Sequence, residues 1–145
     1  NKTFAVLAFH IAGMPLIYSG QEAGMDYALE FFEKDLIKWN DIPLKDFYTK
    51  MFQLHRSNEA LWNGEFGGDF KRITSTADHQ VYAFSRKRGN SEVVVICNLR
   101  DSETKVEFED LPTGDFTSLF DDKDLATISA EGITVPGFGY YVFYK

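Results

Sequence analysis

The chain has 145 residues, of which 44% are hydrophobic and 16% aromatic, so it can fold around a sizeable core. Its formal net charge of −7 argues against nucleic acid as a partner, because phosphate binding needs clustered Lys and Arg. We interpret the short basic run Arg86-Lys87-Arg88 as a solvated hairpin end.

The beginning of the chain is apolar but does not predict a membrane segment. The stretch from Phe4 to Ile17 contains Gly13 and Pro15 and is too short to span a bilayer, so we expect no membrane partner. No basic start leads into a cleavage site, as a signal peptide would require. Because the chain begins at Asn1 and runs directly into an apolar stretch, we expect it to be a piece of a longer protein.

The first two predicted elements are a buried helix and a buried strand. Residues 3–12 are apolar nearly all round, which predicts a helix with Thr3 as its N-cap and an end at Gly13. The continuous apolar run 15–18 is typical of a strand buried on both faces of a parallel sheet. Helix, tight turn and buried strand make up one repeat of an α/β barrel or doubly wound sheet. A lone strand cannot complete its hydrogen bonds, so its neighbours must come from elsewhere.

A loop and a second helix follow. Residues 19–43 are loop-like, and Pro43 opens an amphipathic helix that we expect to continue to Trp62, before Asn63-Gly64 ends it. Its predicted apolar stripe contains Leu44, Phe47, Tyr48, Met51, Phe52, Leu54 and His55.

From Asp69 onward the hydrophobic period changes from helical to two. The candidate strands, separated by Gly, Pro, Asn and Asp turn signals, are 69–76, 80–87, 92–99, 103–109, 115–121, 126–130, 132–136 and 139–144. Short strands at this regular spacing predict an antiparallel sandwich or barrel.

The run Gly13-Met14-Pro15-Leu16-Ile17-Tyr18-Ser19-Gly20-Gln21-Glu22-Ala23-Gly24 resembles a motif of glycoside hydrolase family 13, the α-amylase superfamily. The family pattern is Gly-x-Pro-x-Ile-Tyr-x-Gly-x-Glu-x-Gly, and all of its fixed positions are matched. In that family the motif marks the eighth and last strand of the catalytic (β/α) barrel.

Three later segments extend the resemblance. Ile37-Lys38-Trp39 is similar to the family's Ile-x-Trp, and residues 139–143 are similar to the end of its C-terminal β-domain. Residues 47–56, leading to Ala60-Leu61 and Gly64-Glu65, are similar to its final barrel helix. Two departures occur there, since His55 intervenes before Arg56 and Glu59 stands where Pro is common.

The resemblance implies an α+β fold in two parts. Residues 1–64 would be the C-terminal segment of a catalytic (β/α)8 barrel, made of a helix, strand eight and helix eight. Residues 65–145 would be an all-β antiparallel Greek-key sandwich. The implied function is that of a C-terminal fragment of a retaining α-glucan-acting glycoside hydrolase of the α-amylase type, which hydrolyses α-1,4-glucosidic bonds in starch or maltooligosaccharides.

The resemblance also implies that the catalytic residues lie outside this chain. A retaining glycosidase needs two carboxylates, and in the family these follow barrel strands four and five, N-terminal to Asn1. We therefore assign no catalytic residue and no cofactor, and expect the chain alone to be inactive. The α-glucan partner would bind through the missing barrel, and the substrate-binding residues stay unassigned.

The motif residues would lie at the barrel rim, where active-site loops gather. We favour a structural role for them, with the glycines forming tight turns. These residues are Gly13, Pro15, Tyr18, Gly20, Gln21, Glu22 and Gly24. Four aromatic residues could stack on sugar rings, although core or interdomain packing is the preferred interpretation. These are Trp39, Trp62, Tyr140 and Tyr141.

No metal site is predicted. The run 121–124 (Asp-Asp-Lys-Asp) lacks the spacing of a calcium loop and is interpreted as a solvated turn. His10, His55 and His79 show no metal-ligand spacing. Cys97, the only cysteine, lies in an apolar run and is interpreted as a small buried hydrophobe.

Two alternatives from other functional classes stay open. The chain could be a non-catalytic carbohydrate-binding β-sandwich module. It could also be an interaction protein that forms a homodimer through the exposed surface of the barrel remnant. The sequence does not decide the localisation.

Overall fold

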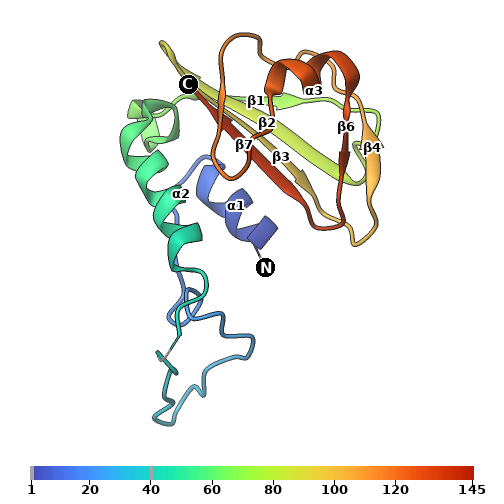
Figure 1. Ribbon diagram of the computed structural model, residues 1–145. Helices are drawn as coiled ribbons and strands as arrows, with labels where there is room; N and C mark the ends of the chain where they lie inside the picture. The colour runs from blue at the N-terminus through green and yellow to red at the C-terminus, as the bar shows by residue number, and fades with distance from the viewer. Residues whose placement is uncertain (1, 40) are drawn as a thin grey trace.

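The computed structural model describes residues 2–39 and 41–145. A five-stranded antiparallel sheet lies at its centre, with two helices on one face and a small sheet and a short helix on the other (Figure 1). The helices are α1 (Lys2–His10), α2 (Lys45–Ser57) and α3 (Leu125–Glu131), with 3-10 turns η1 (Glu59–Leu61) and η2 (Gly64–Phe66). The strands are β1 (Asp69–Ile73), β2 (Val81–Arg88), β3 (Ser91–Asn98), β4 (Thr104–Val106), β5 (Thr117–Ser118), β6 (Ile133–Val135) and β7 (Tyr140–Tyr144).

The five-stranded sheet has the order β1-β2-β3-β7-β5, and β4 pairs with β6 in the small sheet. All of these pairings are antiparallel, with Phe84 opposite Val95 and Val95 opposite Val142. The mixture of helices with antiparallel strands is the α+β class that the sequence predicts.

Both faces of the central strand β3 are buried. Because side chains alternate along a strand, Val93, Val95 and Cys97 face the helices, whereas Val94 and Ile96 face the small sheet. This two-sided burial explains why residues 93–97 form a continuous apolar run. It also confirms that Cys97 is a small buried hydrophobe.

The helical segment and the sheet share one core. Val6 and Phe9 of α1 and Met51 of α2 are buried against Val95 and Val142 of the sheet. Complete burial of such side chains contributes about 1.5–3 kcal/mol each, so this contact fixes the helices on the sheet. A second core on the opposite face contains Ile73, Leu125, Ile128, Val135 and Phe143.

The helix boundaries differ from the prediction at both helices. Helix α1 spans Lys2–His10, so Thr3 lies inside it, and its hydroxyl donates a hydrogen bond to the carbonyl of Phe138 instead of capping. Helix α2 ends at Ser57 and not at Trp62. The cause is Asn58, whose side chain accepts from the Ala60 N–H at 3.1 Å and donates to the Lys145 carbonyl at 3.0 Å.

The predicted strand 126–130 is wrong, because these residues belong to helix α3. The Asp124 carboxylate caps the helix by accepting from the N–H groups of Ala126 and Thr127, both at 3.2 Å. Gly132 follows the helix with a φ of 71°, a conformation that glycine adopts easily. Both capping signals are local and overcome the apolar alternation that suggested a strand.

The run 15–18 has no regular secondary structure and is not a strand in this chain. Among the described residues, no backbone hydrogen bond joins positions 14–17 to another segment. A strand requires a neighbour to complete its ladder, and none is present here.

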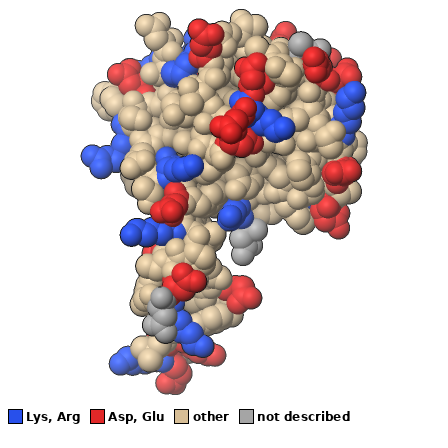
Figure 2. Space-filling model, viewed as in Figure 1, with Lys and Arg blue, Asp and Glu red and all other residues tan. Residues whose placement is uncertain are grey.

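Charged side chains of both signs are interspersed on the face that Figure 2 shows, without a basic stripe. Within the described ranges, no helix is both long and apolar enough to cross a membrane.

Candidate functional site

The motif Gly13–Gly24 forms a bend, an irregular run and a tight loop beside α1 and α2. The φ angles are 137° at Gly13, 90° at Gly20 and 73° at Gly24, all in the region that favours glycine. The loop is closed by hydrogen bonds from the Gln21 N–H to the Tyr18 carbonyl at 3.0 Å and from the Met25 N–H to the Gly20 carbonyl at 3.1 Å.

Exposure alternates along the irregular run. Met14, Leu16 and Tyr18 are 82%, 79% and 57% exposed, whereas Ile17 between them packs against the helical core. A period of two is the signature of a strand with two different faces. Ile17 is therefore packed against the helical core, while the alternate side chains Met14, Leu16 and Tyr18 stay largely exposed.

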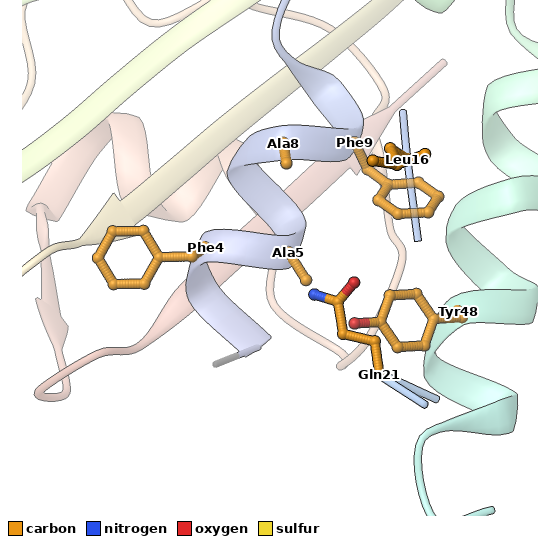
Figure 3. Close-up of a pocket in the computed structure, with 7 residues that line it drawn as sticks. All are labelled: Phe4, Ala5, Ala8, Phe9, Leu16, Gln21 and Tyr48. Carbon is orange, nitrogen blue, oxygen red and sulfur yellow. The ribbon is translucent and has the colours of Figure 1, made fainter. Parts of the chain in front are cut away.

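Gln21 lies in a cleft of about 160 Å³ between the motif, α1 and α2. Its side-chain carbonyl accepts a hydrogen bond from the Tyr18 N–H at 2.9 Å, and Figure 3 shows its amide beside the Tyr48 hydroxyl. The walls of the cleft are mainly apolar and comprise Phe4, Ala5, Ala8, Phe9 and Leu16 together with Gln21 and Tyr48. The Gln21 side chain thus closes the motif loop on itself and lines the cleft beside α1 and α2.

Glu22 lies in a second cleft, of about 270 Å³, between the motif, the end of the following loop and α2. One of its carboxylate oxygens is buried without a hydrogen-bond partner among the described residues. Burial raises the pKa of Tyr48, and the Glu22 charge raises it further, so the two groups are electrostatic neighbours. The cleft is lined by Ile17, Glu22, Trp39, Ile42, Lys45, Tyr48, Thr49 and Phe52.

These clefts do not contain a pair of carboxylates. Retaining hydrolysis needs two, at about 5–5.5 Å from each other, and the residues lining the two clefts include only Glu22. In the part of the chain that the structure describes, no group of three His, Cys, Asp or Glu is placed to hold a metal ion.

Arg86 corrects the interpretation of residues 86–88 as a solvated hairpin end. The Arg86 side chain is only 2% exposed, and it donates hydrogen bonds to the carbonyls of Leu61 at 3.3 Å and Trp62 at 2.8 Å. Tyr82, Phe84 and Arg86 alternate along β2 and share its helix-facing side. This alternation was the signal in the sequence that could have placed Arg86 inside.

Two histidines are close to Arg86. Burial lowers the pKa of His10 to about 4; the hydrogen bond to the Val6 carbonyl opposes this shift, and the His55 and Arg86 charges add to it. Burial also lowers the pKa of His55, with a further contribution from Arg86. The sequence separates these three residues, but the fold brings them together where α1, α2 and β2 meet.

The aromatic residues of the β half are mostly packing residues. Tyr141 is 9% exposed, and the Tyr140 ring lies 5.9 Å from Phe47 and 5.3 Å from Phe120 between ring centroids. The packing interpretation is confirmed for both tyrosines. Trp39 and Trp62 remain 48% and 38% exposed.

The acidic run 121–124 makes local contacts. Asp121 accepts hydrogen bonds from the Ser118 hydroxyl at 2.6 Å and the Lys123 N–H at 3.0 Å. Asp124 caps α3.

Comparison with known proteins identifies the family. Residues 72–142 match the family model described as Maltogenic Amylase, C-terminal domain. α-Amylase 2 of Dictyoglomus thermophilum is 26% identical over 112 residues, which cover 68% of this chain and 18% of that protein. A cyclomaltodextrinase of Thermoanaerobacter pseudethanolicus is 30% identical over 103 residues, which cover 67% of this chain and 17% of that protein. This chain belongs to the α-amylase superfamily and corresponds to its C-terminal part.

Solved structures share the fold of this superfamily member over nearly its whole length. A maltogenic amylase from S. marinus aligns with a TM-score of 0.70 at 18% identity and covers 99% of this chain. A maltogenic α-amylase from Thermotoga neapolitana aligns with a TM-score of 0.66 at 14% identity, also over 99%. The chain covers only 19% and 33% of those two structures. It likewise spans 17–18% of the two curated relatives, so the match concerns a small part of each protein.

Proposed function

We propose that this chain is the C-terminal part of an α-glucan-acting glycoside hydrolase, and that the complete protein hydrolyses α-1,4-glucosidic bonds in starch or maltooligosaccharides. The amylolytic relatives support this substrate class. Hydrolysis would proceed with retention, through two carboxylates supplied by the part of the barrel that precedes this chain.

The observation that carries the proposal is the two-faced run at positions 14–18. Ile17 packs against the helical core, whereas the side chains of Met14, Leu16 and Tyr18 stay largely exposed, with Leu16 at the edge of the cleft beside α1. In a (β/α)8 barrel each strand has this arrangement, with helices outside and inward side chains filling the barrel. Residues 1–64 would then be the end of the barrel, with α1, the run and α2 as helix seven, strand eight and helix eight.

Residues 65–145 would be the β-domain that packs beside the barrel. The chain leaves β3 for β4 of the small sheet, returns to the large sheet as β5, crosses through α3 to β6 of the small sheet, and ends as β7 between β3 and β5. This passage between two sheets supports a Greek-key sandwich.

The motif residues, Glu22 included, would have a structural role at the rim.

The chain alone would be inactive, since the catalytic carboxylates would belong to the preceding part of the barrel and the two clefts beside the motif contain only one carboxylate, that of Glu22. The test compares the complete gene product with this chain in a reducing-sugar assay on soluble starch. The complete product should release sugar, and the chain should not exceed a no-protein blank. Activity of the chain alone would contradict the assignment of catalysis to the missing barrel. The anomer that is released first, read by proton NMR, tests retention.

Size exclusion and maltooligosaccharide titration of the same samples test the two alternative functions, a carbohydrate-binding module and an interaction protein. An inactive complete product that binds maltooligosaccharide would indicate a carbohydrate-binding module. A homodimer without sugar binding would indicate an interaction protein, with the bare apolar face of residues 14–18 as its contact.

A further inference from the structure

The loop between the motif and α2 is long and has no regular structure. Residues 25–39, 41 and 42 belong to neither helix nor strand. Figure 1 shows this loop projecting away from the helices and the sheet, at the lower end of the view. Loops of this length without secondary structure are uncommon in compact domains, and functional binding loops are one of the main reasons for their presence.

Both ends of the loop are fixed at the motif. A Cβ atom added at Gly20 would lie 2.9 Å from the Met25 sulfur and 3.4 Å from a methyl carbon of Ile37, so both side chains pack closely on this glycine. At the other end, the Leu44 N–H donates to the Glu22 carbonyl at 3.2 Å. The motif therefore sets the direction in which the loop leaves the body.

The tip of the loop displays two aromatic rings. Phe31 and Phe32 are each 90% exposed, and their ring centroids lie 4.8 Å apart in an edge-to-face arrangement. The Glu30 N–H donates to the Asp35 carboxylate at 3.2 Å and closes the turn that carries them. Glu30 and Glu33 are also exposed on this turn, so carboxylates flank the aromatic pair.

We propose that the Phe31–Phe32 tip binds the α-glucan chain of the substrate beyond the barrel rim; this inference rests on the proposed function. Pyranose rings present flat C–H faces on which aromatic rings stack, and their rim hydroxyls can donate to carboxylates such as those of Glu30 and Glu33. A paired aromatic tip with acidic neighbours matches both features of such a ligand.

The position of the loop favours the substrate as the occupant. The bare side chains of Met14 and Leu16 lie on the run itself, where neighbouring barrel strands would cover them. The loop instead follows the C-terminal end of the run, and in (β/α)8 barrels the loops at this end form the active-site face. Phe31 and Phe32 would therefore lie outside the packed barrel wall, on the side from which substrate enters.

The experiment uses the complete gene product with the double substitution Phe31→Ala and Phe32→Ala. The control is Phe66→Ala, which removes a ring that is 60% exposed in η2. For each protein, kcat and KM are measured on maltoheptaose and on the short substrate p-nitrophenyl α-maltoside. Thermal unfolding and size exclusion accompany these measurements.

The double variant should lose about tenfold in kcat/KM on maltoheptaose through KM, and about twofold or less on the short substrate, which does not reach the tip. The Phe66→Ala protein should match the wild type. Unchanged kinetics, or an equal loss on both substrates, would overturn the inference. Conversion of a dimer into a monomer by the double substitution would also overturn it, in favour of a second copy as the partner. A wild-type product without activity on maltoheptaose would contradict the proposed function itself, and this inference with it.

Discussion

The Arg86 guanidinium donates a hydrogen bond of 2.8 Å to the main-chain carbonyl of Trp62. This contact joins strand β2 to the segment that leads from the helices into the sheet. The same guanidinium donates to the Leu61 carbonyl at 3.3 Å, so one buried side chain satisfies two acceptors at the end of η1. Charge-assisted bonds of this kind are stronger than neutral ones.

We predict that Arg86→Ala destabilises the chain by about 2–4 kcal/mol, because it leaves buried carbonyls without donors. The measurement is the free energy of unfolding in urea. Lys87→Ala is the matched control, because the Lys87 side chain is 57% exposed and Glu92, its buried salt-bridge partner at 3.4 Å, keeps a second salt bridge to Lys145 at 3.2 Å. Removing an exposed cation that is backed by a second one should cost at most about 1 kcal/mol. Equal effects of the two substitutions would show that Arg86 does not hold the segments together.

A second prediction concerns acid. Burial lowers the pKa of His10 from 6.5 to about 4 in the folded chain, so the unfolded chain takes up the proton first as the pH falls. The stability that neutral His10 provides is complete above its unfolded pKa and is lost as the pH falls through its folded pKa. Protonation of His10 should lower the free energy of unfolding by about 3 kcal/mol as the pH falls from its unfolded pKa to its folded pKa.

The test is the unfolding free energy of the wild type and of His10→Leu at several pH values between 7 and 4, an interval set by the linkage relation. The difference between the two proteins isolates His10 from the carboxylates that also titrate in acid. His79→Leu, at an exposed position, is the control for the His→Leu change itself. A His10→Leu protein with the wild-type slope would contradict the prediction.

A third prediction concerns the thiol. Cys97 is fully buried, and burial raises its pKa to about 12. Because the thiolate is the reactive form, Ellman's reagent at mildly alkaline pH should label folded protein at least about a hundredfold more slowly than protein unfolded in urea. Similar labelling rates in both states would mean that the α1–β3 contact opens readily.

Sequence patterns predicted the elements whose signals are local and periodic. The helix over 3–12 and the hairpin strands 80–87 and 92–99 correspond to α1, β2 and β3 within a few residues. The strand predicted at 126–130 failed because alternation was given more weight than the Asp124 and Gly132 caps of α3.

Other features depend on contacts between distant residues. Asn58 ends α2 early partly by bonding to the carbonyl of Lys145, which lies 87 positions away. The burial of Arg86 depends on the carbonyls of Leu61 and Trp62 lying opposite its strand face. The Gly13–Gly24 motif marked the region of the two clefts. The clefts beside Gln21 and Glu22 could not be predicted from the sequence, and neither could the projection of the aromatic tip, because both depend on how distant segments pack in three dimensions.

The central claim is that residues 14–18 form a barrel strand in the complete protein. Amide hydrogen exchange of Leu16 and Ile17 tests it most directly, since neither N–H has a backbone partner among the described residues. In this chain both amides should exchange rapidly. In the complete gene product, pairing with neighbouring strands should slow them by at least about a hundredfold. Equally rapid exchange in both proteins would contradict the barrel assignment.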